Sequence, residues 1–162
     1  MSKAPPEGWY PDSPGMTRWW RISIVACLAC FALALTAMPA EAAPAVRFTK
    51  VQYNSPGNDT GSNYSLNAEW VRITNHRSTD RVLTGWTIKD KAGFVYTFPT
   101  FTLKAGASVR VHTGSGTDSK TDLYWDRSWY VWNNTGDTAY LRTTSVTHDS
   151  CSWGAGSGVK YC

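Results

Sequence analysis

Hydrophobic and polar residues alternate with a period of two along most of the chain after residue 45. This period is typical of strands that bury one face, whereas a helix repeats its apolar positions every three or four residues. No convincing helical pattern occurs in this part of the sequence. The clearest alternating segments are residues 46–53, 69–75, 86–88, 94–98, 109–111 and 139–141.

Glycine and proline residues separate these segments and predict turns between short strands. A hairpin turn is expected at residues 89–93, where the sequence Lys-Asp-Lys-Ala-Gly joins two alternating segments. The same spacing along the rest of the chain predicts six to eight short strands. The sequence therefore predicts an all-β fold, built as a sandwich or a barrel.

The first 42 residues follow a different pattern and predict an export signal. Arg18 and Arg21 precede an apolar run over residues 22–38, and small residues follow the run. Ala40 and Ala42 occupy the two key positions of an A-x-A cleavage site. We therefore expect cleavage after Ala42 and a secreted protein.

Several alternatives to this interpretation of the N-terminus stay open. Cleavage after Ala45 is the second choice, and an uncleaved signal anchor is the rival, although the apolar run is short of the roughly 20 residues that span a bilayer. Translation from Met16 instead of Met1 would give a compact signal. Residues 8–12 and 18–20 resemble a short motif of actinobacterial membrane proteins, which favours an actinobacterial source and the signal-anchor alternative.

Removing residues 1–42 leaves about 120 residues, the size of one ordinary domain. The chain has 16 Lys and Arg against 12 Asp and Glu, and three of each class lie in the removed segment, so the net charge stays at +4. These charges are scattered along the sequence. They favour solubility and weak attraction to anionic cell-surface polymers, and no nucleic-acid partner is expected.

The cysteine pattern agrees with export. Cys27 and Cys30 lie in the signal segment, which leaves Cys151 and Cys162 as a pair. An even pair in a secreted chain predicts a disulfide, and this one would close a short glycine-rich loop at the C-terminus. We expect the bond to hold a tail that would otherwise fray.

The order of the segments resembles the lamin tail domain, in the form found in secreted bacterial proteins. The matching motifs cover most of residues 46–145: EWVRITN at 69–75, LTGWTIKD at 83–90, YTFP at 96–99, FTLKAG at 101–106, VRV at 109–111, LYW at 123–125, VWNN at 131–134 and GDTA at 136–139. The resemblance implies an immunoglobulin-like β-sandwich that acts as a non-catalytic interaction module. The cysteine-bearing tail departs from the family pattern.

Residues suited to catalysis are few. His76, His112 and His148 are scattered and show no metal-ligand spacing. Glu69 and Asp137 are the candidate acids, and hydrogen bonding to neighbouring turns explains them better than a catalytic pair. We therefore expect no enzymatic activity and no cofactor.

One loop is rich in oxygen ligands. Asn58, Asp59 and Asn63 offer the carboxylate and amide oxygens that calcium prefers. Their spacing does not match an EF-hand, and a polar loop before the next strand explains them as well. Calcium binding by these three residues is therefore a hypothesis.

Aromatic residues crowd the segment 124–132, which gives the best indication of function. Strand alternation does not bury all of them on one face, and the lamin-tail resemblance places Trp125 and Trp132 in the core. Trp129 and Tyr130 are therefore the expected exposed pair, suited to stacking on sugar rings or to a protein interface.

Three functions are considered. A small hydrolase is disfavoured because the sequence lacks a catalytic set, and the other two differ in the partner. The first is a secreted interaction module whose partner is an unknown extracellular protein or cell-envelope polymer. The alternative is a carbohydrate- or cell-wall-binding module that uses the exposed aromatic pair.

Overall fold

The computed structural model describes residues 44–162 of the chain. The predicted export signal, its cleavage after Ala42 and the alternative start at Met16 fall on residues 1–43 and lie outside the described residues. No helix within residues 44–162 is long and apolar enough to cross a membrane.

The described part of the chain folds almost entirely into strands. The sequence predicts six to eight of them; the structure has eleven, because several, such as β3 and β6, are only two residues long and show no alternation. The strands are β1 (Val46–Gln52), β2 (Trp70–Asn75), β3 (Arg81–Val82), β4 (Thr87–Lys89), β5 (Val95–Thr97), β6 (Thr102–Leu103), β7 (Ser108–His112), β8 (Asp122–Tyr124), β9 (Gly136–Arg142), β10 (Thr147–Gly154) and β11 (Val159–Tyr161).

One short helix within residues 44–162 corrects the expectation of a domain without helices. It is α1 (Asn63–Asn67), and the Ser62 side chain caps it by accepting a hydrogen bond from the Ser65 backbone N–H at 3.3 Å. Five residues are too few for a helical period to show in the sequence.

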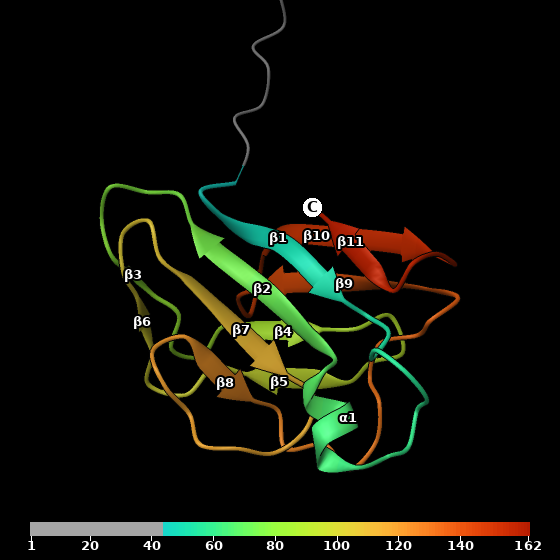
Figure 1. Cartoon of the computed structure of the whole chain (residues 1–162). Coiled ribbons are helices and arrows are strands. Elements are labelled where there is room, and N and C mark those ends of the chain that lie inside the picture. Colours follow the sequence, from blue (N-terminus) through green and yellow to red (C-terminus); the bar gives the residue numbers. More distant parts are fainter. Residues whose placement is uncertain (1–43) are drawn as a thin grey trace, which may run out of the picture. The chain divides into compact units, whose positions relative to one another are not determined.

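Two main sheets build the sandwich (Figure 1). The five-stranded sheet has the order β11-β1-β2-β7-β8, the four-stranded sheet has the order β10-β9-β4-β5, and β3 pairs with β6 beside them. Neighbouring strands are antiparallel except β7 and β8, which are parallel. The predicted all-β fold is confirmed, and it is a sandwich and not a barrel.

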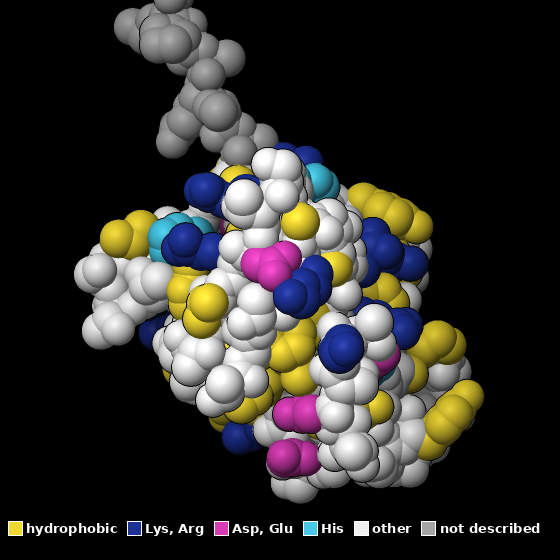
Figure 2. Space-filling view, turned by 90° about the vertical axis from the view of Figure 1, so that its left-hand side faces the viewer, with side chains coloured by type: hydrophobic (Ala, Val, Ile, Leu, Met, Phe, Trp, Pro, Cys, Tyr) yellow, Lys and Arg dark blue, Asp and Glu magenta, His cyan; other side chains and the backbone are white. Residues whose placement is uncertain are grey.

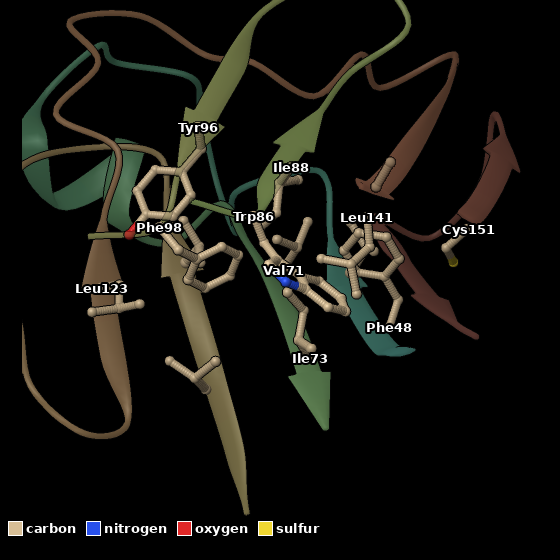
Figure 3. Close-up of a cluster of buried hydrophobic side chains, with 14 of the residues drawn as sticks. Phe48, Val71, Ile73, Trp86, Ile88, Tyr96, Phe98, Leu123, Leu141 and Cys151 are labelled. Atoms are coloured by element: carbon tan, nitrogen blue, oxygen red, sulfur yellow. The ribbon is translucent and has the colours of Figure 1, made fainter. Parts of the chain in front are cut away.

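The core lies between the inner faces of the two sheets (Figure 3). Phe48 and Ile73 come from the five-stranded sheet, Ile88 and Leu141 come from the four-stranded sheet, and none of these side chains is exposed. Burying one such side chain stabilises the fold by about 1.5–3 kcal/mol. Buried and half-buried residues alternate along β2 and β9, as the sequence predicts.

A β-bulge in β1 changes which of its residues face outward. The register with β2 shifts between Phe48 and Lys50, so Thr49 is the extra residue. Phe48 is buried before the bulge and Val51 after it, an odd spacing that a regular strand does not give. Lys50 consequently lies on the outer face of the five-stranded sheet, where it lines an open depression with Trp70.

The Cys151–Cys162 disulfide is present, as predicted. Cys151 is buried in β10 of the four-stranded sheet, and Cys162 directly follows β11 of the five-stranded sheet. Both strands are sheet edges. The bond therefore joins one edge of each sheet, in addition to holding the C-terminal tail.

Candidate functional site

The outer face of the five-stranded sheet carries a row of positive charges on three neighbouring strands. The register places Lys50 of β1 opposite Arg72 of β2, and Arg72 opposite Arg110 of β7. We call these three residues the cationic row. Tyr161 of β11 and Asp122 of β8 stand at its two ends. This sheet faces the viewer in Figure 1 and forms the right-hand edge of Figure 2, where Lys and Arg side chains lie beside hydrophobic ones.

Aromatic rings hold two members of the cationic row in place. Lys50 Nζ lies 5.4 Å from the centre of the Trp70 ring and 5.2 Å from the centre of the Tyr161 ring. The Arg110 guanidinium lies 5.7 Å from the centre of the Trp70 ring. Cation–π contacts contribute about 0.5–1 kcal/mol each at exposed sites, so the rings restrict where these charges stand.

A line of hydroxyl groups runs beside the cationic row. Thr49, Thr74 and Ser108 come from three adjacent strands. Thr74 Oγ1 lies 3.0 Å from Thr49 Oγ1 and 2.8 Å from Ser108 Oγ. The Nε atom of Arg72 donates a hydrogen bond to Thr49 Oγ1 at 2.9 Å. The cationic row and Ser108 line an open depression of about 430 Å³.

Asp122 is the counter-ion at one end of the cationic row. Among residues 44–162, it is the only carboxylate that forms an ion pair with the row, through Arg110 Nε at 2.9 Å. His112 Nε2 lies at 2.9 Å from the same carboxylate oxygen. Burial raises the pKa of Asp122, but hydrogen bonds from His112 and Thr121 outweigh it and hold the pKa below its ordinary value. Asp122 is therefore ionised at neutral pH.

The predicted aromatic pair does not form one flat platform. Trp129 is 62% exposed, whereas Tyr130 is half-buried, and the two rings lie 72° apart. The Tyr130 hydroxyl lies 2.5 Å from Ser65 Oγ and accepts a hydrogen bond from the Gly61 N–H at 3.3 Å. Trp129 packs against Gly61. Tyr130 therefore holds α1 to the preceding loop, and Trp129 alone presents an exposed ring.

The residues of the predicted calcium site have other partners. Asn63 Oδ1 accepts a hydrogen bond from the Ser115 N–H at 2.7 Å, and Asp59 Oδ2 accepts one from Asn134 Nδ2 at 3.3 Å. Asn58 is exposed in the loop before Asp59. No group of three or more His, Cys, Asp and Glu side chains within residues 44–162 is placed to hold a metal. Calcium binding by Asn58, Asp59 and Asn63 stays a prediction.

A comparison with protein-family models decides the family. The model described as Lamin Tail Domain matches residues 39–155. The chain belongs to the lamin tail domain family. Its two-sheet architecture is therefore the immunoglobulin-like sandwich that the sequence motifs predict. No curated protein was found to match the chain.

The C-terminal tail extends the lamin tail domain beyond the matched region. The match ends at residue 155, whereas β11 covers Val159–Tyr161 and Cys162 follows it. Strand β11 adds an edge strand beside β1 and supplies the Tyr161 ring to the cationic row. Part of the candidate site thus lies outside the segment that the family model recognises.

Glu69 is a buried structural carboxylate of the lamin tail domain. It is 1% exposed, and it accepts hydrogen bonds from the Thr113 hydroxyl at 2.5 Å, the Val131 N–H at 3.1 Å and the Trp132 N–H at 2.9 Å. Burial raises the pKa of Glu69 to about 7, although these hydrogen bonds oppose the shift. All the bonds run to the protein itself, so Glu69 organises the aromatic segment.

Asp137 holds the same segment from the other side. Its Oδ2 atom accepts a hydrogen bond from the Asn133 N–H at 3.1 Å, and its Oδ1 atom accepts bonds from the N–H groups of Lys91 and Thr138. The two candidate acids therefore accept hydrogen bonds from consecutive backbone N–H groups of one loop, those of residues 131–132 for Glu69 and of Asn133 for Asp137. This arrangement supports the hydrogen-bonding interpretation of both carboxylates.

The histidines are dispersed over the described surface. His112 lies between the Asn67 carbonyl oxygen, 2.7 Å from its Nδ1 atom, and Asp122. His148 stacks on Trp86 with ring centres 4.3 Å apart; burial and the nearby Arg81 lower its pKa. His76 is exposed. His112 is therefore a hydrogen-bonding residue, and His148 packs against Trp86.

The cationic row is not evident from the sequence. Lys50, Arg72 and Arg110 each stand alone among polar residues of separate alternating segments. Alternation does place Arg72 and Arg110 on the solvent side of their strands. The strand order and register bring the three charges together, and the sequence pattern contains neither.

Proposed function

We propose that this lamin tail domain works outside the cytoplasm as a non-catalytic module that binds a macromolecule. The observation that carries the proposal is the placement of three cations and two aromatic rings on an open sheet face. An open face suits an extended partner, whereas small-molecule sites are usually enclosed clefts. The export-type N-terminal sequence and the disulfide support a location outside the cytoplasm.

The hydrogen bonding of the buried acids supports a non-catalytic role. A general acid or base has to reach a substrate proton directly or through one water molecule. The carboxylate oxygens of Glu69 and Asp137 instead accept hydrogen bonds from N–H and hydroxyl groups of the protein. The membership of the lamin tail domain family points the same way.

A second candidate function is carbohydrate binding at the aromatic segment. The 62% exposure of Trp129 favours it, because an exposed indole face stacks well on a sugar ring. Tyr130 does not contribute to this candidate, since its hydroxyl is engaged by Ser65 and Gly61.

The test is a binding and cleavage screen of the exported protein. The full-length chain is expressed in a secreting bacterial host, and the N-terminus of the recovered protein is sequenced. The protein is then applied to arrays of envelope polysaccharides and extracellular proteins, and each polymer is assayed for cleavage. Binding without cleavage is expected. Retention of the protein in the cytoplasm, cleavage of a bound polymer, or an absence of binding overturns the proposed function.

The same screen separates the two candidates. Trp129→Ala abolishes carbohydrate binding if the aromatic segment is the site, and leaves it unchanged if the sheet face is the site. Tyr64→Ala is the control, because Tyr64 is 89% exposed on α1 and its removal deletes an exposed ring outside the segment 124–132.

A further inference from the structure

We propose that the cationic row of Lys50, Arg72 and Arg110 binds an anionic polysaccharide through the carboxylates of its acidic sugars. The inference rests on the proposed function and names the surface and the chemical class of the partner. The polymer lies across β1, β2 and β7 over the open depression.

The strand register gives the cationic row an electrostatic cost. Side chains directly opposite on paired strands have Cβ atoms about 4.5–5.5 Å apart, and like charges in that position are destabilising. Lys50 faces Arg72 and Arg72 faces Arg110, so two such repulsive contacts occur in succession. An anionic ligand relieves both contacts at once.

Two of the three cations in the row have no counter-ion within residues 44–162. Within residues 44–162, the ion pairs are Lys104–Asp80, Arg110–Asp122 and His112–Asp122. Lys50 and Arg72 therefore have no carboxylate within ion-pair distance in this part of the chain. A guanidinium presents five donors in a planar fork that matches a carboxylate, and in Arg72 only Nε is hydrogen-bonded within the described residues.

The groups around the three charges suit a polymer of sugars. The hydroxyl groups of Thr49, Thr74 and Ser108 lie beside the row and can exchange hydrogen bonds with sugar hydroxyls. Single-stranded nucleic acid requires free ring faces on which its bases stack. The Trp70 ring is instead contacted by the charged groups of Lys50 and Arg110. These contacts favour an acidic glycan over a nucleic acid.

The experiment measures binding of the exported protein to polygalacturonate, a polymer with one carboxylate on each sugar. Fully methyl-esterified polygalacturonate is the uncharged counterpart, and a single-stranded DNA oligonucleotide tests the nucleic-acid outcome. Binding to polygalacturonate is expected to weaken as salt rises, because salt screens exposed charges. The esterified polymer has no charged carboxylates to pair with Lys and Arg, so it is expected to bind at least about tenfold more weakly.

Two pairs of variants locate the surface. The double variant K50Q/R72Q is expected to weaken polygalacturonate binding by about tenfold or more, since each lost cation removes a charge-assisted contact. R77Q/K91Q also removes one Arg and one Lys, at exposed positions outside the row where neither side chain forms an ion pair within residues 44–162, and it is expected to bind as the wild type does. Tyr161→Ala, which removes a ring beside Lys50, is expected to weaken binding, whereas Tyr64→Ala is not.

The outcomes distinguish this inference from the proposed function. Binding of polygalacturonate that K50Q/R72Q leaves unchanged overturns the inference alone, because another surface then carries the function. The inference is also overturned if the esterified polymer binds equally well, or if polygalacturonate does not bind at low salt. It is overturned as well if the oligonucleotide binds more tightly through Lys50 and Arg72. If the array identifies a polymer or protein that binds this domain at a surface other than the cationic row, the proposed function still holds.

Discussion

At the scale of single residues, the buried carboxylate of Glu69 makes stability depend on pH. Its pKa in the folded state, about 7, exceeds the ordinary value of 4.5 because burial disfavours the charged form. Between these two values the folded chain holds this proton more tightly than the unfolded chain does. The free energy of unfolding is therefore highest at or below pH 4.5 for this group, and it decreases as the pH rises to about 7.

The variant Glu69→Gln tests this dependence. The free energy of unfolding of the wild type, measured in urea, is expected to decrease by about 3 kcal/mol between pH 4.5 and pH 7.5 because of this group, since one pKa unit corresponds to about 1.4 kcal/mol. The difference between the wild-type and Glu69→Gln curves isolates that loss. Thr113→Val removes a hydrogen bond that lowers the pKa and is expected to extend the decrease to higher pH. Parallel wild-type and Glu69→Gln curves would contradict the assignment.

The Tyr130 hydroxyl is a second residue whose role is structural. Tyr130→Phe removes the hydrogen bonds to Ser65 and Gly61, and a lost hydrogen bond of this kind costs about 1 kcal/mol. We expect denaturant unfolding to show that decrease for Tyr130→Phe and no change for Tyr64→Phe, whose ring is 89% exposed. Equal stability of the two variants would show that the Tyr130 bonds do not hold α1.

At the scale of the elements, the disulfide joins β10 to the residue after β11, the edge strand that supplies Tyr161 to the proposed site. Strand β11 lies outside the matched family segment and pairs only with β1, so few contacts hold it besides the Cys151–Cys162 bond. The double variant C151A/C162A is expected to lose about 3 kcal/mol of unfolding free energy, the loop-closure contribution of a short loop.

Hydrogen exchange shows where that loss is located. In C151A/C162A the backbone amides of β11 and of residue 162 are expected to exchange faster. In the native chain the Cys162 N–H donates a hydrogen bond to the Thr49 carbonyl oxygen at 3.3 Å. The amides of β2, in the middle of the sheet, serve as the internal control. Unchanged protection of β11 would mean that pairing with β1 alone holds the strand.

The elements also show why the sequence predicted the core better than the site. Burial of alternate residues is a local property, so the strands around Ile73 and Leu141 were evident from their periodicity. Lys50 faces outward only because Thr49 forms a bulge, and local periodicity does not reveal a bulge. Tyr130 follows Trp129 in a loop, where alternation gives no information on exposure. Register and loop packing depend on the whole fold.

At the scale of the whole molecule, the net charge of +4 conceals an uneven distribution. The sequence shows scattered charges, whereas the sheet collects three cations on one face with one carboxylate at the end of the row. Such a row lowers the stability of the unliganded domain.

This cost is measurable without any ligand. Raising the salt concentration from about 0.01 M to about 1 M shortens the screening length from about 30 Å to about 3 Å and weakens the repulsion among Lys50, Arg72 and Arg110. The free energy of unfolding of the wild type is expected to rise by roughly 0.5 kcal/mol more than that of K50Q/R72Q over this range. R77Q/K91Q has the same net charge as K50Q/R72Q, and it is expected to follow the wild type, because Arg77 and Lys91 lie outside the row and form no ion pair within residues 44–162. If the two double variants respond to salt alike, the repulsion comes from net charge and not from the register of β1, β2 and β7.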